Sequence, residues 1–320
     1  MLVSMLERKE LVEEITYWKK KRNAVLLAHN YQLPEIQDIA DVLGDSLHLA
    51  RATTEVEADV IIFCGVHFMA ETSAILNPDK KVLLPDINAG CSLADSITVE
   101  QLREWKKQHP NATVVAYVNT SADVKAESDY CCTSSNAVEV VNAIPEDQEI
   151  LFLPDMFLGS FVQRQTGRKN MHIWMGECHV HAGIAPEHID KVTNEHPGAD
   201  LLVHPECGCS TSTIYLAGEG ELPEDKTHIL STGRMLDHSK KSNAEEFIVA
   251  TETGILHQMQ KLNPEKQFIA ANPEAVCPFM KMITLEKVLH SLKEDTHVIS
   301  VPESTANKAR RAIERMVAIG

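Results

Sequence analysis

The chain has 320 residues, 44% of them hydrophobic and 24% charged, as in an ordinary globular protein. Its 46 acidic residues outnumber 30 Lys and Arg, and the net charge of −16 argues against nucleic acid as a partner. No run approaches the roughly 18 apolar residues of a membrane span, and residues 1–7 lack the apolar core of a signal peptide, so we expect a cytoplasmic protein without a membrane segment.

Strand-like and helix-like segments alternate along the chain. Helices are predicted at 4–21, 34–43, 98–107 and 305–319, and Thr98 with Gln101 forms a capping box at the start of the third. Short apolar runs predict strands at 25–28, 60–63, 82–84, 113–116, 150–153, 201–203, 247–250 and 267–269. This alternation predicts the α/β class, with parallel sheets covered on both faces.

A longer unit occurs three times. Its copies open with strands at 24–30, 113–119 and 200–206, and each strand ends in polar side chains. Hydroxyl clusters follow each strand, and they contain Ser46, Ser134, and Ser231 with Thr232. The repeat therefore predicts three homologous αβα domains, at 1–107, 108–190 and 191–284, with residues 285–320 packed on the first.

Three cysteines occupy corresponding places in the copies. Cys91, Cys178 and Cys277 are 87 and 99 residues apart, and each follows the second half of its unit. Functional groups gather at the carboxyl ends of strands in open α/β sheets, so a pseudo-threefold arrangement would bring the three thiols to one centre. In a reducing compartment such thiols indicate a metal or an iron–sulfur cluster. The spacing alone does not separate iron–sulfur from zinc, and buried core cysteines are the plainer alternative.

Several motifs carry a specific resemblance to a known family. They are Ala28-His29-Asn30-Tyr31, Gly44-Asp45-Ser46, Gly90-Cys91-Ser92-Leu93-Ala94-Asp95, Ala116-Tyr117-Val118-Asn119-Thr120, Cys132-Thr133-Ser134-Ser135-Asn136-Ala137, Gly176-Glu177-Cys178, His204-Pro205-Glu206-Cys207, Ser231-Thr232 and Cys277-Pro278-Phe279-Met280-Lys281. In this order they resemble the quinolinate synthase family, over about four-fifths of the chain. The resemblance implies a 4Fe–4S cluster held by Cys91, Cys178 and Cys277, with one iron left open as a Lewis acid.

The resemblance also implies the reaction. Iminoaspartate condenses with dihydroxyacetone phosphate, with loss of phosphate and water, to give quinolinate for de novo NAD biosynthesis. Iminoaspartate is unstable in water, so L-aspartate oxidase is the expected supplier. These substrates carry two carboxylates and a phosphate, and a chain with a charge of −16 must attract them locally.

Candidate roles follow for the polar residues at the strand ends and helix starts. His29 and His204 would bind a carboxylate or move a proton, and Glu206 would act as a base. Tyr31 and Tyr117 offer phenolic hydroxyls for proton transfer. Asn119 would hydrogen-bond the triose, and anions would bind at Ser46, Ser134, Ser231 and Thr232. Ordinary helix capping is the alternative for the hydroxyl residues. Met280 and Lys281 either shape the wall of the site or only pack.

The other five cysteines receive no ligand role. Cys64, Cys131 and Cys132 lie in apolar surroundings and are expected to pack in the core. Cys207 and Cys209 stand beside His204 and Glu206, so a redox or peripheral role stays open for them.

Two further functions compete with the enzyme. One is a non-catalytic iron–sulfur protein that senses oxygen or iron. The other is a zinc hydrolase with Cys and His ligands, which would be colourless and insensitive to air. A sensor has no need of the proton-handling residues at the strand ends, so these residues favour the enzyme.

Overall fold

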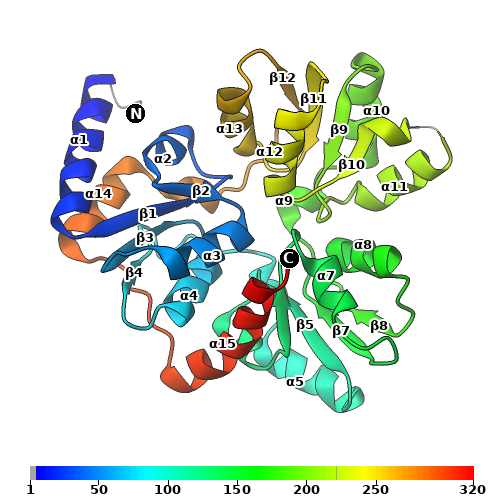
Figure 1. Ribbon diagram of the computed structural model, residues 1–320, viewed down its shortest axis with the longest axis horizontal. Coiled ribbons are helices and arrows are strands. Elements are labelled where there is room, and N and C mark those ends of the chain that lie inside the picture. Colours follow the sequence, from blue (N-terminus) through cyan, green and yellow to red (C-terminus); the bar gives the residue numbers. More distant parts are fainter. Residues whose placement is uncertain (1–4, 221) are drawn as a thin grey trace.

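Three parallel sheets of four strands each organise the chain, which is described at residues 5–220 and 222–320 in a computed structural model (Figure 1). The first sheet contains β1 (Ala24–His29), β2 (Val42–Gly44), β3 (Val60–Cys64) and β4 (Lys81–Leu83). Its helices are α1 (Met5–Lys21), α2 (Pro34–Ile39), α3 (Ser46–Glu55), α4 (His67–Leu76) and, from the far end of the chain, α14 (Leu285–Glu294).

The second sheet contains β5 (Thr113–Tyr117), β6 (Tyr130–Cys132), β7 (Ile150–Leu153) and β8 (Met171–Ile173). Its helices are α5 (Val99–Gln108), α6 (Ala122–Ala126), α7 (Ala137–Asn142) and α8 (Met156–Thr166), after a 3-10 turn η1 (Ala94–Ser96). The predicted capping box opens α5, since the Gln101 N–H donates to Thr98 Oγ1 (3.2 Å) and the Thr98 N–H donates to Gln101 Oε1 (2.8 Å).

The third sheet contains β9 (Asp200–Val203), β10 (Thr227–Ile229), β11 (Glu246–Ala250) and β12 (Gln267–Ala270). Five helices belong to this region: α9 (His179–Ala182), α10 (Pro186–Glu195), α11 (Ser210–Gly218), α12 (Thr232–Lys241) and α13 (Ile255–Leu262). Two 3-10 turns, η2 (Glu224–Lys226) and η3 (Met280–Met282), complete it, and α15 (Glu303–Ala318) ends the chain.

All three sheets have the same strand order. The orders are β2-β1-β3-β4, β6-β5-β7-β8 and β10-β9-β11-β12, and every strand pair is parallel. The central strands are almost wholly buried, as in parallel sheets that are covered on both faces. The predicted α/β class with three copies of one unit is confirmed. Figure 1 places the three sheet-containing units around a common middle, while their pseudo-threefold symmetry stays a prediction.

One predicted helix is shorter than expected. The pattern at 34–43 predicts a helix throughout, but α2 ends at Ile39 and residues 42–44 form β2. Asp41 causes the change, because its N–H donates to the Leu26 carbonyl (2.9 Å) while its carboxylate accepts the Leu26 N–H (2.7 Å). These bonds align the chain with β1, so Val42 and Leu43 continue as an edge strand.

The two C-terminal helices, α14 and α15, pack against different parts of the molecule. Helix α14 packs on α1, but α15 packs on α6 and β6 as well as on α3 and α4, so it joins the first two units. The Arg51 Nε donates to the Val317 carbonyl (3.0 Å), and Asn136 Nδ2 donates to the Ile319 carbonyl (2.8 Å). Both helices thus contact the first unit, where residues 285–320 are expected, and α15 packs on the second unit as well; the predicted domain boundaries stay predictions.

None of the helices in the described ranges combines the length and the apolar character needed to cross a lipid bilayer.

Candidate active site

Residues from all three units line one cavity. About 720 Å³ of space outside the atoms lies in it, and part of this space is open to solvent. His29 and Tyr117 end β1 and β5, and His204 follows β9, so the lining comes from the carboxyl ends of strands, as expected. The predicted residues that line it are His29, Tyr31, Ser46, Cys91, Tyr117, Asn119, Ser134, Cys178, His204, Glu206, Thr232, Cys277 and Met280.

The three cysteines of the repeat share one local geometry. Each is a free, partly buried thiol just before a helical turn: Cys91 before η1, Cys178 before α9 and Cys277 before η3. Each sulfur accepts hydrogen bonds from the backbone N–H groups two and three residues further along, which are Leu93 and Ala94, Val180 and His181, and Phe279 and Met280. Three separate units thus present a sulfur in the same way to one cavity.

This donor set fits a cationic metal centre. Burial raises the pKa of Cys91 to about 12 and also raises the pKa of Cys178 and Cys277, while the backbone N–H groups lower all three. A buried thiolate at neutral pH therefore needs a positively charged partner in addition to those N–H groups. Thiolates that accept backbone hydrogen bonds are typical ligands of iron–sulfur clusters.

Two histidines and a glutamate form a buried group beside the cysteines. Glu206 Oε2 lies 3.4 Å from His181 Nδ1 and 3.3 Å from His204 Nδ1. Burial lowers the pKa of His181 to about 3 and that of His204 well below its usual value, so both rings are neutral. Burial raises the pKa of Glu206 to about 7, against the effect of a hydrogen bond from Tyr117. Glu206 can therefore gain and lose a proton near neutral pH.

Both predicted tyrosines are buried at this group. The Tyr31 hydroxyl lies 2.6 Å from Thr251 Oγ1 and 3.3 Å from His181 Nε2. Burial raises the pKa of both Tyr31 and Tyr117 well above the usual value, and the charge of Glu206 adds to this effect. Both phenols are therefore protonated at neutral pH and can donate hydrogen bonds.

Hydroxyl groups lie at the starts of two helices that reach the cavity. Ser46 and Thr232 are the first residues of α3 and α12, and Asn30 Nδ2 donates to Thr232 Oγ1 (3.2 Å). Ser134 instead lies in the turn before α7, with its Oγ 3.2 Å from His204 Nε2. Ser231 is the N-cap of α12, where its Oγ accepts the Arg234 N–H (3.4 Å), and it is absent from the described cavity lining.

Lysine and arginine side chains do not contribute to the described lining of the cavity. Among the described lining residues no Lys or Arg occurs, whereas Asp45, Glu206 and Glu252 are present. Helix starts and backbone N–H groups are the features of this lining that favour anions, and local attraction of the substrate anions stays a prediction.

Lys281 is absent from the described cavity lining and forms an ion pair with Glu252, which lines the cavity. Its Nζ is 2.9 Å from Glu252 Oε1 and also donates to the Tyr31 carbonyl. Glu252 is fully buried and accepts the N–H groups of Gly254 (2.7 Å) and Cys277 (3.0 Å). This pair fixes the backbone of Cys277 relative to Tyr31, so Lys281 has a structural contact to the site.

The other cysteines differ from the three at the cavity. Cys64, Cys131 and Cys132 are fully buried in β3 and β6, and their expected core packing is confirmed. Cys207 and Cys209 are also fully buried and form a disulfide with each other. This disulfide lies directly after Glu206 and cross-links the turn that follows β9.

Sequence reasoning missed three residues of this site. His181, Thr251 and Glu252 contact Tyr31, Glu206, Cys178 or Cys277. His181 stands three residues after Cys178, one helical turn away, and this spacing is the signal that identifies it. Thr251 and Glu252 follow β11 directly, so they occupy a strand end like the residues that were predicted.

Comparison with known proteins decides the family. A family model described as "Quinolinate synthetase A protein" matches residues 13–318. The chain belongs to the quinolinate synthase family. The quinolinate synthase of Mycobacterium sp. (strain KMS) is 58% identical over 311 residues, covering 97% of this chain and 92% of that protein. A quinolinate synthase of Thermus thermophilus is 56% identical over 310 residues, covering 97% of both chains.

A third quinolinate synthase, from Mycobacterium tuberculosis (strain H37Ra), is 56% identical over 299 residues, which cover 93% of this chain and 86% of that protein. The predicted resemblance to the quinolinate synthase family is therefore confirmed over nearly the whole chain.

The pKa of Glu206 predicts a dependence of stability on pH in the metal-free chain. A carboxyl whose folded pKa is raised from 4.5 to about 7 stabilises the fold below pH 4.5, and this contribution is lost as the pH rises through 7. We expect Glu206→Gln to unfold at higher urea than the parent, by an advantage that grows by roughly 2–3 kcal/mol from pH 5 to pH 8. The control is Glu139→Gln, which removes a surface carboxylate paired with Arg234. The same pH dependence in both variants would contradict the prediction.

Proposed function

We propose that the chain is a quinolinate synthase that condenses iminoaspartate with dihydroxyacetone phosphate, with loss of phosphate and water, in de novo NAD biosynthesis. Family membership over residues 13–318 supports the reaction. The observation that carries the assignment of the site is the single cavity to which all three units contribute one cysteine each, in matching backbone geometry.

We propose Cys91, Cys178 and Cys277 as the ligands of a 4Fe–4S cluster. Three free thiols that accept the same pair of backbone N–H bonds support this choice over the other five cysteines, which are buried in the core or paired in a disulfide. When bound, a cluster with three cysteine ligands supplies an iron with an open position, which acts as a Lewis acid on a substrate oxygen.

The helix starts and imidazoles would bind the substrate anions. Helices α3 and α12 direct free N–H groups and the hydroxyls of Ser46 and Thr232 to the cavity, and both features favour phosphate or carboxylate. Ser134 and His204 are in contact and can bind one anionic oxygen together. His29 and Asn119 extend the polar lining for the second substrate. The remaining wall includes the apolar side chain of Phe68.

Glu206 would move the protons on carbon that imine and enamine steps require. Its pKa of about 7 and its contact with His181 and His204 suit a group that accepts and returns protons at neutral pH. Tyr31 and Tyr117 stay protonated and would donate to developing oxyanions. These roles belong to residues that touch one another, so they form a connected path for protons.

Tyr117→Phe tests the phenol separately from the cavity shape. We expect the iron content to stay at the parent level while kcat falls by roughly 10–100-fold, because one hydrogen-bond donor to the reacting groups is lost. Iron analysis and anoxic steady-state kinetics measure the two quantities. Tyr130→Phe is the matched control, since Tyr130 lies under Arg315 away from the cavity. Unchanged kcat in Tyr117→Phe would refute a role for its hydroxyl.

A non-catalytic iron–sulfur sensor remains the alternative from another class. One measurement distinguishes the two functions. Strictly anoxic protein with an intact cluster is incubated with dihydroxyacetone phosphate and freshly generated iminoaspartate, and the quinolinate formed is quantified. The enzyme forms quinolinate over many turnovers. No quinolinate with the cluster intact would remove the proposed activity. We further propose that an aspartate-oxidising enzyme, such as L-aspartate oxidase, supplies the unstable imine, and that both work in the cytoplasm.

A further inference from the structure

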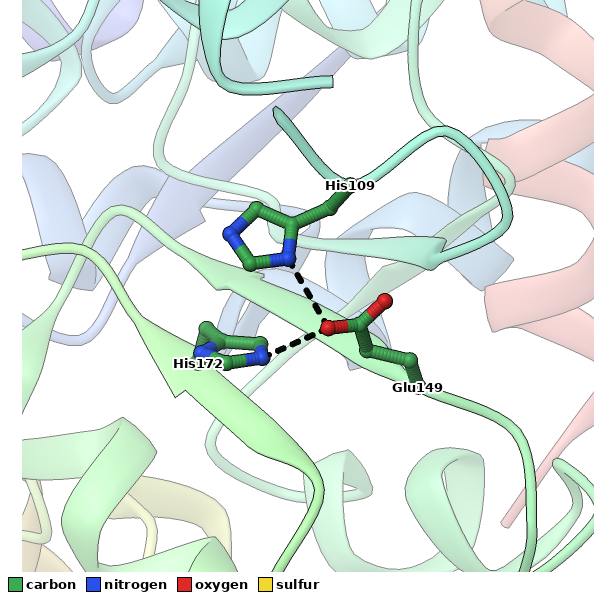
Figure 2. Close-up of side chains that lie close together, drawn as sticks. All are labelled: His109, Glu149 and His172. Carbon is green, nitrogen blue, oxygen red and sulfur yellow. Dashed lines mark hydrogen bonds and ion pairs between the residues drawn. The ribbon is translucent and has the colours of Figure 1, made fainter. Parts of the chain in front are cut away.

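A second group of metal-ligating side chains lies in the middle unit, apart from the cavity. Figure 2 shows His109, Glu149 and His172 with their polar atoms directed at one another. His109 follows α5, Glu149 directly precedes β7, and His172 lies within the edge strand β8. The group therefore sits towards the amino end of β7, whereas the cavity is lined from the carboxyl ends of the strands, and none of its members lines that cavity.

The two imidazoles converge on a single carboxylate oxygen. Glu149 Oε1 lies 2.8 Å from His109 Nδ1 and 2.7 Å from His172 Nε2, and one ligand atom from each residue lies within 4.8 Å of the others. The centres of the two rings are 4.3 Å apart. In a tetrahedral zinc site with bonds of about 2.0–2.1 Å, ligand atoms are about 3.3 Å apart. Small side-chain rotations would therefore open this group enough to accept an ion.

Backbone hydrogen bonds hold the three segments in place without any ion. The Thr113 N–H donates to the Glu149 carbonyl (2.8 Å), and the Ile150 N–H donates to the Asn170 carbonyl (2.9 Å). In the β7–β8 register His172 pairs with Leu151, two residues after Glu149. The Ala112 N–H donates to the His109 carbonyl (3.1 Å). The ligands are thus preorganised, which lowers the entropic cost of binding.

The group is open to solvent, and its side chains are suitable ligands for a divalent metal ion. The side chains of His109, Glu149 and His172 are 22%, 34% and 44% exposed, so an ion and its water ligands can reach them. Two imidazoles and one carboxylate form a ligand set that suits Zn²⁺ and the neighbouring first-row divalent ions.

We propose that His109 Nδ1, His172 Nε2 and Glu149 Oε1 form a binding site for a divalent transition-metal ion, with Zn²⁺ as the representative ion and water in the remaining positions. The bound ion would link the end of α5 to β7 and β8. Because it binds the folded chain, it would raise the free energy of unfolding by RT ln(1 + c/Kd) at a free ion concentration c, so the stability grows with the logarithm of the ion concentration.

Zinc binding to the cluster-loaded protein tests the proposal. Anoxic holoenzyme is freed of loosely bound metal and dialysed against Zn²⁺, and bound zinc is counted beside the iron. The same samples are titrated with Ni²⁺ while tryptophan fluorescence is followed, because the Trp105 ring lies 6.4 Å from that of His109 and a paramagnetic ion there quenches it. We expect one zinc per chain beyond the iron, with a micromolar Kd, and saturable quenching by Ni²⁺.

Substitutions of the proposed ligands test whether the zinc binds at this group. Glu149→Gln keeps the side-chain shape, and in His172→Ala the lost ring is exposed on an edge strand, so both variants are expected to fold, as circular dichroism would check. We expect each to raise the zinc Kd at least 30-fold and to abolish the Ni²⁺ quenching. The control His257→Ala removes a surface histidine that bonds Asp38 (2.9 Å), and it should bind zinc like the parent.

A competing group tests the location further. Asp200, His228 and His238 also lie close together in the third unit. Loss of the zinc in His228→Ala, with parent-like binding in His172→Ala and Glu149→Gln, would overturn the proposal. Equal zinc affinity in the parent and in both of these variants would also overturn it, and would leave the three residues as a hydrogen-bonded link.

Discussion

Each of the single substitutions Cys91→Ser, Cys178→Ser and Cys277→Ser is expected to abolish quinolinate formation and to remove most of the iron. The physical reason is that each unit contributes one ligand, and a hydroxyl is a much poorer ligand for iron than a thiolate. The backbone N–H pair at each sulfur would then face an atom that carries no negative charge. Iron and sulfide analysis of anoxically purified protein, together with the visible absorption of the cluster, measures the effect.

Other cysteines provide matched controls for these variants. Cys132→Ala removes a fully buried thiol from β6, and it should lose some stability through packing but retain the iron and the activity. A double Cys207→Ala, Cys209→Ala variant removes the disulfide and should also keep the iron. A full cluster in Cys277→Ser would show that the third unit contributes no ligand and would contradict the assignment.

Glu206→Gln is expected to lower kcat by roughly 10²–10⁴-fold with the iron content unchanged, because general acid–base catalysis contributes this much. Glutamine keeps the shape and can still accept the Tyr117 hydrogen bond, but it cannot take up a proton. The KM values should change little, since the anion-binding helix starts of α3 and α12 are untouched.

The same residue determines the expected pH profile. A base must be deprotonated to act, so kcat/KM of the parent, which reports the ionisation of the free enzyme, should fall about tenfold per pH unit below the Glu206 pKa of about 7. The Gln variant should lack this limb. Glu139→Gln, at the surface, is the control and should reproduce the parent profile. Parent-like kcat in Glu206→Gln would exclude the carboxylate as the base.

The repeat and its strand ends were predictable from the sequence because they depend on local patterns. The apolar runs that became β1, β5 and β9 end in His29, Tyr117 and the turn to His204, and parallel sheets place such ends at one edge. Cysteine spacing then placed one thiol in each unit. Of the residues predicted as cluster ligands, catalytic groups or substrate-binding groups, all except Ser231 line one cavity in the structure.

Short edge strands and long-range contacts were not predictable in the same way. Strand β6 has three residues and exists because Tyr130–Cys132 pairs with Val115–Tyr117, a contact that no local period reveals. Likewise, the ion pair of Glu252 depends on η3, which brings Lys281 close to it. The contact of Thr251 with the Tyr31 hydroxyl depends on the packing of the first unit against the third. The helix expected at 34–43 was shortened by Asp41 bonding to Leu26 of β1.

A label-transfer assay with the anoxic, cluster-loaded protein tests the proposed reaction most directly. Dihydroxyacetone phosphate labelled with ¹³C in all its carbons is combined with iminoaspartate labelled with ¹⁵N, and the product and the free phosphate are measured together. We expect quinolinate that carries the nitrogen label and the triose carbons, with one phosphate released per quinolinate. Phosphate release without labelled quinolinate, or no product while the cluster is intact, would contradict the proposed condensation.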